Sequence, residues 1–129
     1  MRFRYTILYV RDVPAALDFY AAAFGFKIAF LHEGKDYGEL VTGETKLAFA
    51  ARDLIRQLGD EPSLISPKSP AFGLSFESED VAHDLDRAVA AGAELEKPIV
   101  HQPWGQTTCS VSDPDGYLIE ICSAVDGKS

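Results

Sequence analysis

The sequence predicts an α+β domain made of two tandem βαβββ modules related by pseudo-twofold symmetry. Two observations lead to this prediction. A shift of 68 positions places residues 12–23 on residues 80–91, and six of those twelve positions are then identical. In both copies a short strand-like run precedes the shared segment, and three such runs follow it. We therefore expect one domain over 1–129, with modules at about 3–51 and 70–123 and a linker at 52–69.

The shared segment has the signals of a capped helix in both copies. Asp12 and Asp80 stand where a side-chain oxygen accepts the first free backbone N–H groups of a helix. Apolar residues then recur every three or four positions, which predicts one buried stripe along each helix. Helices are therefore expected at 13–24 and 80–91. A glycine that favours the left-handed conformation ends each of them, Gly25 and Gly92.

The strands are expected where apolar and β-branched residues alternate between turn residues. Their ranges are Tyr5–Val10, Phe26–Glu33, Tyr37–Thr42 and Thr45–Ala51 in the first module, and Gly73–Ser78, Glu94–Lys97, Gln106–Ser112 and Tyr117–Cys122 in the second. Asp113-Pro-Asp-Gly116 predicts a tight turn before the last strand. The linker should hold one helical turn, and the chain after Ser123 reads as a frayed tail.

The composition restricts the partners. With 47% hydrophobic residues, a net charge of -8 and a pI near 4.7, the chain reads as a folded acidic protein that disfavours nucleic acid and membrane surfaces. The N-terminal apolar run is too short for a signal peptide or a membrane span, which predicts a cytoplasmic protein. Cys109 and Cys122 lie on adjacent predicted strands; spacing allows a bridge, but reduced buried thiols are the commoner case in such a chain.

Several motifs agree with a known family. They are Tyr9-Val-Arg-Asp-Val13 before the Leu17-Asp-Phe-Tyr20 helix, Phe24-Gly-Phe26, Pro103-Trp-Gly-Gln106, and Asp113-Pro-Asp-Gly-Tyr-Leu-Ile-Glu-Ile121. With the repeated module, the chain resembles the glyoxalase/bleomycin-resistance/extradiol-dioxygenase superfamily, also called the vicinal-oxygen-chelate superfamily, over roughly residues 3–122. The resemblance implies curled mixed sheets around one cavity, usually in a homodimer. It implies no single reaction, since members include isomerases, dioxygenases, thiol transferases and non-catalytic drug binders.

The same resemblance bears on metal binding. Metal-dependent members place His, Glu or Gln ligands on the first and fourth strand of each module. The corresponding positions here are Tyr5, Gly73, Glu120 and a position within about Leu47–Phe49. Only Glu120 suits a divalent cation, and one carboxylate does not hold such an ion. No cofactor is therefore expected, and a divalent metal is disfavoured.

Strand alternation suggests which side chains meet a ligand in the cavity. The expected ligand-binding residues are Tyr5, Tyr9, Phe49, Ser75, Trp104 and Glu39, with Glu120 as the candidate catalytic residue at the floor. Tyr5 is expected to donate a hydrogen bond to the Glu120 carboxylate. Each residue also has a simpler explanation. Aromatic residues on strands more often pack in a hydrophobic core than bind a ligand. Trp104 could fill a hydrophobic gap beneath its loop instead of contacting a ligand. Glu39 could be a solvated charge at the rim of the cavity, and Glu120 a hydrogen-bonded carboxylate with a structural role.

Two functions follow from these residues. The first is a metal-independent protein that binds a small aromatic or cationic molecule, as in sequestration of an antibiotic; aromatic rings and carboxylates suit such a ligand. The second is a lyase, isomerase or dioxygenase that uses Glu120, with a metal completed by Glu39 or His101 or as a bare base. The sequence leaves open whether the chain is an enzyme.

Overall fold

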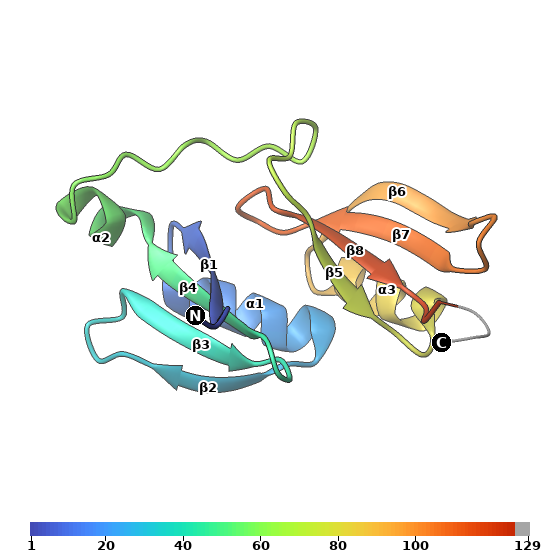
Figure 1. The fold of residues 1–129 in the computed structure, drawn as a ribbon, viewed down its shortest axis with the longest axis horizontal. Helices are drawn as coiled ribbons and strands as arrows, with labels where there is room; N and C mark the ends of the chain where they lie inside the picture. The colour runs from blue at the N-terminus through green and yellow to red at the C-terminus, as the bar shows by residue number, and fades with distance from the viewer. Residues whose placement is uncertain (126–129) are drawn as a thin grey trace. The chain divides into compact units, whose positions relative to one another are not determined.

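The computed structural model describes residues 1–125 and divides into two compact units, which we call unit 1 (Met1–Leu64) and unit 2 (from Ile65). Each unit holds one βαβββ module, as the sequence predicts (Figure 1). The predicted tail falls on residues 124–125, which have no regular secondary structure, and on 126–129, which lie outside the described residues. None of the helices in 1–125 has the length and apolar character that a membrane span requires.

Unit 1 is a four-stranded mixed sheet with one long helix. Its elements are β1 (Tyr5–Val10), α1 (Val13–Phe24), β2 (Lys27–Leu31), β3 (Tyr37–Val41), β4 (Lys46–Ala51) and the short α2 (Arg52–Gln57). The strand order is β1-β4-β3-β2, in which β1 and β4 run parallel and the other neighbours antiparallel. The helical turn expected in the linker is α2.

Unit 2 repeats this topology. Its elements are β5 (Leu74–Glu77), α3 (Val81–Ala90), β6 (Glu94–His101), β7 (Thr107–Ser112) and β8 (Leu118–Cys122), in the order β5-β8-β7-β6. The first and last strands again pair in parallel. The predicted turn before β8 is present: Gly116 has φ 96 and its N–H donates to Asp113 O at 3.0 Å. Gly116 is required there because its φ is positive and an added Cβ would lie 2.8 Å from Ile65 O.

The predicted helix caps are confirmed. The Asp12 carboxylate accepts from Ala15 N at 3.1 Å, and the Asp80 carboxylate accepts from His83 N at 3.1 Å. Gly25 ends α1 with φ 78, and Gly92, one residue beyond the cap of α3, has φ 114. The local sequence therefore determines where both long helices begin and end.

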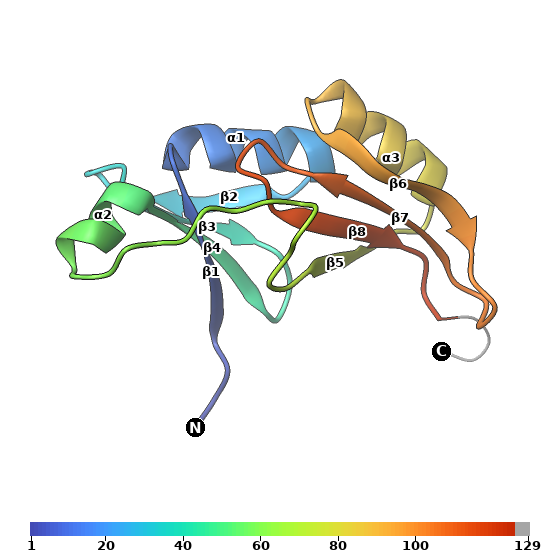
Figure 2. The same cartoon turned by 90° about the horizontal axis from the view of Figure 1, so that it is seen from above.

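One helix covers one face of each sheet (Figure 2). In unit 1 the Tyr20 ring packs edge-on against Phe49 with 4.9 Å between ring centres, above the fully buried Leu8. The helix lies so close to β3 that a Cβ on Gly38 would lie 2.7 Å from Leu17 Cδ1. In unit 2 the core beneath α3 is smaller, since Val81 and Ala88 are the buried residues of that helix.

Strand alternation leaves the other face of each sheet uncovered by its own helix. Leu8 and Val10 have no exposed area. Tyr5, Ile7 and Tyr9, at the odd-numbered positions of the same strand, are 38–42% exposed. This agrees with the predicted direction of the β1 side chains. We call this side of each sheet its open face.

One expectation about the strands needs correction. β6 extends from Glu94 to His101, four residues past its predicted end at Lys97, because an edge strand tolerates Pro98 and register shifts that would break a central strand. The two cysteines are buried free thiols, which agrees with the commoner case expected from the sequence. Cys109 and Cys122 sit on adjacent strands, but Cys122 pairs with Thr108 rather than Cys109, so the two thiols point to opposite faces.

Candidate functional site

The open face of unit 1 is aromatic and aliphatic, with one carboxylate at its centre. The strand register assigns these side chains to it: Tyr5, Ile7, Tyr9, Phe30, Tyr37, Glu39, Lys46, Ala48 and Ala50. The centre is buried even though no helix covers it, since Ala48 is 0% and Glu39 6% exposed. The small side chains of Ala48 and Ala50 pair with Ile7 and Tyr9, and larger rings share the same face.

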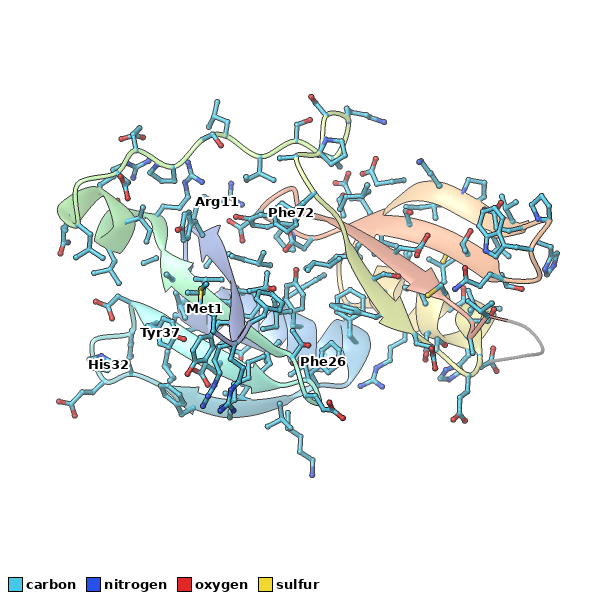
Figure 3. All side chains as sticks on the ribbon, viewed as in Figure 1. Met1, Arg11, Phe26, His32, Tyr37 and Phe72 are labelled. Carbon is cyan, nitrogen blue, oxygen red and sulfur yellow. The ribbon has the colours of Figure 1, made fainter. Side chains whose placement is uncertain are left out.

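Glu39 is held by two neighbours on this face. The Tyr37 hydroxyl donates to Glu39 Oε2 at 2.8 Å, and Lys46 Nζ lies 3.8 Å from Glu39 Oε1. Tyr37 stands at the start of β3, beside the turn that carries His32 (Figure 3). Burial, and then the nearby Glu39 carboxylate, raise the pKa of Tyr37 well above its ordinary range, which keeps the hydroxyl a donor. The expectation that Glu39 is a solvated rim charge is therefore wrong.

Two cations flank the Tyr5 ring. Lys46 Nζ lies 6.0 Å from the ring centre and the Arg4 guanidinium carbon 5.9 Å from it. These distances fall within the range of cation–π attraction. Tyr5 is thus an exposed ring whose π-face already attracts positive charge.

Phe49 does not belong to the open face. It pairs with Leu8 across β4 and β1, is 0% exposed and packs on Tyr20 beneath α1. The expectation that Phe49 lines the ligand site is wrong, because the open-face residues of β4 are its neighbours Ala48 and Ala50. Phe49 stabilises the core of unit 1 instead.

The open face of unit 2 is polar. Ser75 pairs with Glu120, and Glu120 pairs with Ser110 on the next strand. The Ser75 hydroxyl donates to Glu120 Oε1 at 2.6 Å and lies 3.3 Å from Cys122 Sγ. Two of the predicted site residues, Ser75 and Glu120, are therefore brought together. The predicted hydrogen bond from Tyr5 to Glu120 would join the two units and stays a prediction.

Trp104 lies in the β6–β7 hairpin and is 58% exposed. Its indole Nε1 donates to Gln106 Oε1 at 2.8 Å, while Gln106 Nε2 donates to Ser123 O at 2.9 Å. The indole is therefore oriented by hydrogen bonds rather than by a core. His101, near the same hairpin, has its Nδ1 3.0 Å from Thr107 Oγ1.

The residues around Glu120 do not fit a divalent cation. Its neighbours in unit 2 are a hydroxyl and, beyond it, a thiol. The matching pair in unit 1, by strand register, is Ile7 and Ala48, which have no ligand atoms. Within residues 1–125 no three His, Cys, Asp or Glu side chains gather in a way that could hold a metal ion. We therefore derive no chemistry through a metal.

Two residues on the open face of unit 1, Lys46 and Phe30, were not predicted from the sequence. Strand alternation does predict that Ile7 faces the same way as Tyr5 and Tyr9. It also predicts that Cys122 shares the face of Glu120, where its Sγ lies 3.3 Å from Ser75 Oγ. The role of Lys46 could not be predicted from the sequence, since a lysine at the start of a strand normally points into solvent.

The chain was compared with known proteins. A family model described as the Glyoxalase/Bleomycin resistance protein/Dioxygenase superfamily matches residues 2–121. The uncharacterized protein YraH of Bacillus subtilis (strain 168) is 32% identical over 117 residues, which are 88% of this chain and 91% of that protein. A protein of unknown function from Agrobacterium tumefaciens str. C58 is 30% identical with a TM-score of 0.77, covering 96% of this chain and 94% of its own.

A glyoxalase-related enzyme from Fulvimarina pelagi has a TM-score of 0.81 at 24% identity, covering 95% of this chain and 88% of its own. At that identity the likeness concerns the fold alone. The match to the family model covers nearly the whole chain, and it agrees with the two βαβββ units and with the motifs in the sequence. The chain belongs to the Glyoxalase/Bleomycin resistance protein/Dioxygenase superfamily.

Proposed function

We propose that this protein binds a small, flat organic molecule without the help of a metal, and that it acts by sequestering an aromatic or cationic compound such as an antibiotic. The proposal is based on the side chains of the open face of unit 1. There Tyr5, Tyr9 and Ile7 are 38–42% exposed beside a floor of buried alanines and one buried carboxylate. A surface that combines partly exposed apolar side chains with a buried charged group is typical of sites that bind small organic molecules.

A search for a bound compound tests this proposal. The protein is purified from its native host and from a heterologous host, and both samples are measured by native mass spectrometry and cocrystallised with panels of planar compounds. A compound that adds mass and shifts the NMR signals of the Ala48 and Ala50 amides supports the proposal. Binding confined to other surfaces would contradict it.

A lyase, isomerase or dioxygenase that uses Glu120 is the second candidate. It is favoured by one observation: Ser75 Oγ donates to Glu120 Oε1 at 2.6 Å, which orients the carboxylate as a general base would need. The captured compound separates the two candidates. If the compound is converted on incubation to a product of different mass or to an isomer with a different NMR spectrum, and Glu120→Gln stops that conversion while binding persists, the protein is an enzyme.

We also propose a cytoplasmic homodimer. Each unit has exposed apolar side chains on an edge strand, Phe30 and Leu31 on β2 and Val100 on β6. A twofold partner commonly covers such edges. Sedimentation at micromolar concentration should report about twice the chain mass of 14.1 kDa. A clean monomer would contradict this part of the proposal.

A further inference from the structure

Lys46 occupies an unusual place on the open face of unit 1. Its ammonium lies 3.8 Å from Glu39 Oε1 and 6.0 Å from the centre of the Tyr5 ring. A carboxylate and an aromatic π-face are the two groups that proteins use together to bind organic cations. The position of the lysine ammonium thus indicates that the space between Glu39 and Tyr5 favours a positively charged nitrogen.

The Glu39 carboxylate is incompletely satisfied by its neighbours. It is 6% exposed, and its partners in the described part of the chain are the Tyr37 hydroxyl at 2.8 Å and the Lys46 ammonium at 3.8 Å. Two carboxylate oxygens offer about four acceptor positions. A charge-assisted hydrogen bond is about 2.7–2.9 Å long, so the Lys46 contact is an ion pair without a good hydrogen bond. One oxygen can therefore still take a close N–H donor.

The Lys46 ammonium can move away from Glu39 into water at little cost. The Lys46 side chain is 46% exposed and sits at the start of β4, whereas Glu39 is anchored in the middle of β3. A flexible, strongly hydrated ammonium loses little when it returns to water. The fixed parts of the arrangement are the carboxylate and the Tyr5 ring, and the mobile part is the lysine.

We infer that the ligand of the open face is an aromatic ammonium or amidinium. Its charged nitrogen replaces the Lys46 ammonium between Glu39 and Tyr5, so that Lys46 occupies the ligand's position in the unliganded protein. This deepens the proposed function and rests on it, since it names the class of compound. The aromatic ring of the ligand then lies over Ala48 and Ala50 beside Ile7 and Tyr9. Lys46 lowers the affinity by competing for the same place.

Unit 2 provides a matched control. Lys68 Nζ lies 3.6 Å from Glu96 Oε1, and the Glu96 side chain is 10% exposed, so this ion pair resembles the Lys46–Glu39 pair in distance and in the burial of its carboxylate, although Lys68 itself is more exposed than Lys46. Within residues 1–125 no cation–π contact accompanies Lys68. Removing Lys68 changes the net charge as much as removing Lys46 does, but it leaves the place between Glu39 and Tyr5 occupied.

The experiment titrates the ¹⁵N-labelled full chain with 2-naphthylmethylammonium and with its neutral analogue 2-naphthylmethanol. We expect the ammonium to shift the amides of Glu39 and Ala48 and to bind about 3- to 30-fold more tightly than the alcohol. Lys46→Met should tighten ammonium binding about 3- to 10-fold, whereas Glu39→Gln should weaken it about 10-fold. Neither variant should change the affinity for the alcohol.

Three control measurements accompany the titration. Lys68→Met should leave the ammonium affinity unchanged, and Lys46→Arg, which keeps the charge, should bind like the wild type. Amide spectra of each variant report whether it remains folded.

Two outcomes overturn the inference and are distinguishable. Equal affinities for the ammonium and the alcohol, unaltered by Lys46→Met, mean that the open face binds rings without recognising charge; the proposed function then stands. If neither compound shifts the amides of Glu39, Ala48 and Ala50, this face binds no such molecule. The proposed function then fails together with the inference.

Discussion

The two units share a topology, yet their open faces are chemically different. In unit 1, Ile7 pairs with Ala48 and Ala48 with Glu39; at the same register in unit 2, Ser75 pairs with Glu120 and Glu120 with Ser110. Each face thus has a central carboxylate, but on a different strand. The fold repeats positions and not chemistry, so site residues cannot be transferred from one unit to the other.

The difference extends to what surrounds each carboxylate. Glu39 is hydrogen-bonded to Tyr37 and paired with Lys46, which also lies over the Tyr5 ring. Glu120 is hydrogen-bonded to a serine that contacts a thiol. Rings beside a carboxylate suit recognition of a flat cation. A carboxylate oriented by a hydroxyl suits proton transfer. Under the proposed function, unit 1 is the unit that binds the ligand, and a reaction of the second candidate function would use Glu120 of unit 2.

The largest expected effect is on the free energy of unfolding, and it differs between the covered face of unit 1 and its open face. Phe49→Ala should lower the free energy of unfolding by about 3–5 kcal/mol, because it leaves a cavity against Tyr20. Tyr5→Ala, on the open face of the same sheet, should cost about 1–2 kcal/mol, because the ring is 38% exposed. Urea unfolding of both variants measures the difference. Similar losses would mean that the open-face rings serve stability rather than binding.

The next effect concerns Trp104. If Trp104 is a ligand contact, as the sequence predicts, Trp104→Ala should weaken binding of 2-naphthylmethylammonium by about 1–3 kcal/mol, as expected for loss of one stacking anchor, with little change in stability. Titration calorimetry of the variant against the wild type measures this loss.

The same residue gives a spectroscopic test. Trp104 is the one tryptophan of the chain, so its fluorescence reports on this hairpin alone. If Trp104 stacks on the ligand, as the sequence predicts, its emission should change when the ammonium binds. Unchanged emission and unchanged affinity would show that the open face of unit 1 acts without Trp104.

These residues also show what a single sequence can predict. The caps at Asp12 and Asp80, the turn at Gly116 and the alternation in β1 are local signals, and all are confirmed. Phe49 was assigned to the wrong face because β4 is apolar on both faces. Its run of buried residues has no period from which to read a direction.

Contacts between distant strands were the other limit. Burial of Glu39 depends on neighbours from β1, β3 and β4, and the bond from Ser75 to Glu120 joins residues 45 positions apart. Neither follows from the pattern within one strand, since strand pairing and register determine both. The family motifs indicated which fold to expect, but not which side chains meet on its faces.

A smaller effect is expected from the hydroxyl that supports Glu39. Tyr37→Phe should lower the free energy of unfolding at neutral pH by about 1 kcal/mol, because a buried carboxylate loses its hydrogen bond. The folded pKa of Tyr37 is raised, so its contribution to stability is complete below the unfolded pKa of about 10 and is lost as the pH rises above it. Tyr37→Phe should therefore make stability less sensitive to pH above about 10. Parallel decline of both proteins would contradict this role of Tyr37.

The smallest expected effect is that of chelation, and it tests whether either carboxylate needs a metal. Glu120 has a hydroxyl as its hydrogen-bond donor, and Glu39 has a hydroxyl and an ammonium, so each has a partner from the chain. A bound ion would stabilise the folded state in proportion to its affinity. We expect the melting temperature to stay the same after treatment with EDTA, and metal analysis of protein purified without chelator to find no stoichiometric divalent ion. A lower melting temperature that returns with added metal, and that Glu120→Gln abolishes but Glu39→Gln does not, would show that unit 2 contributes a metal ligand. The lyase, isomerase or dioxygenase candidate would then take precedence over sequestration.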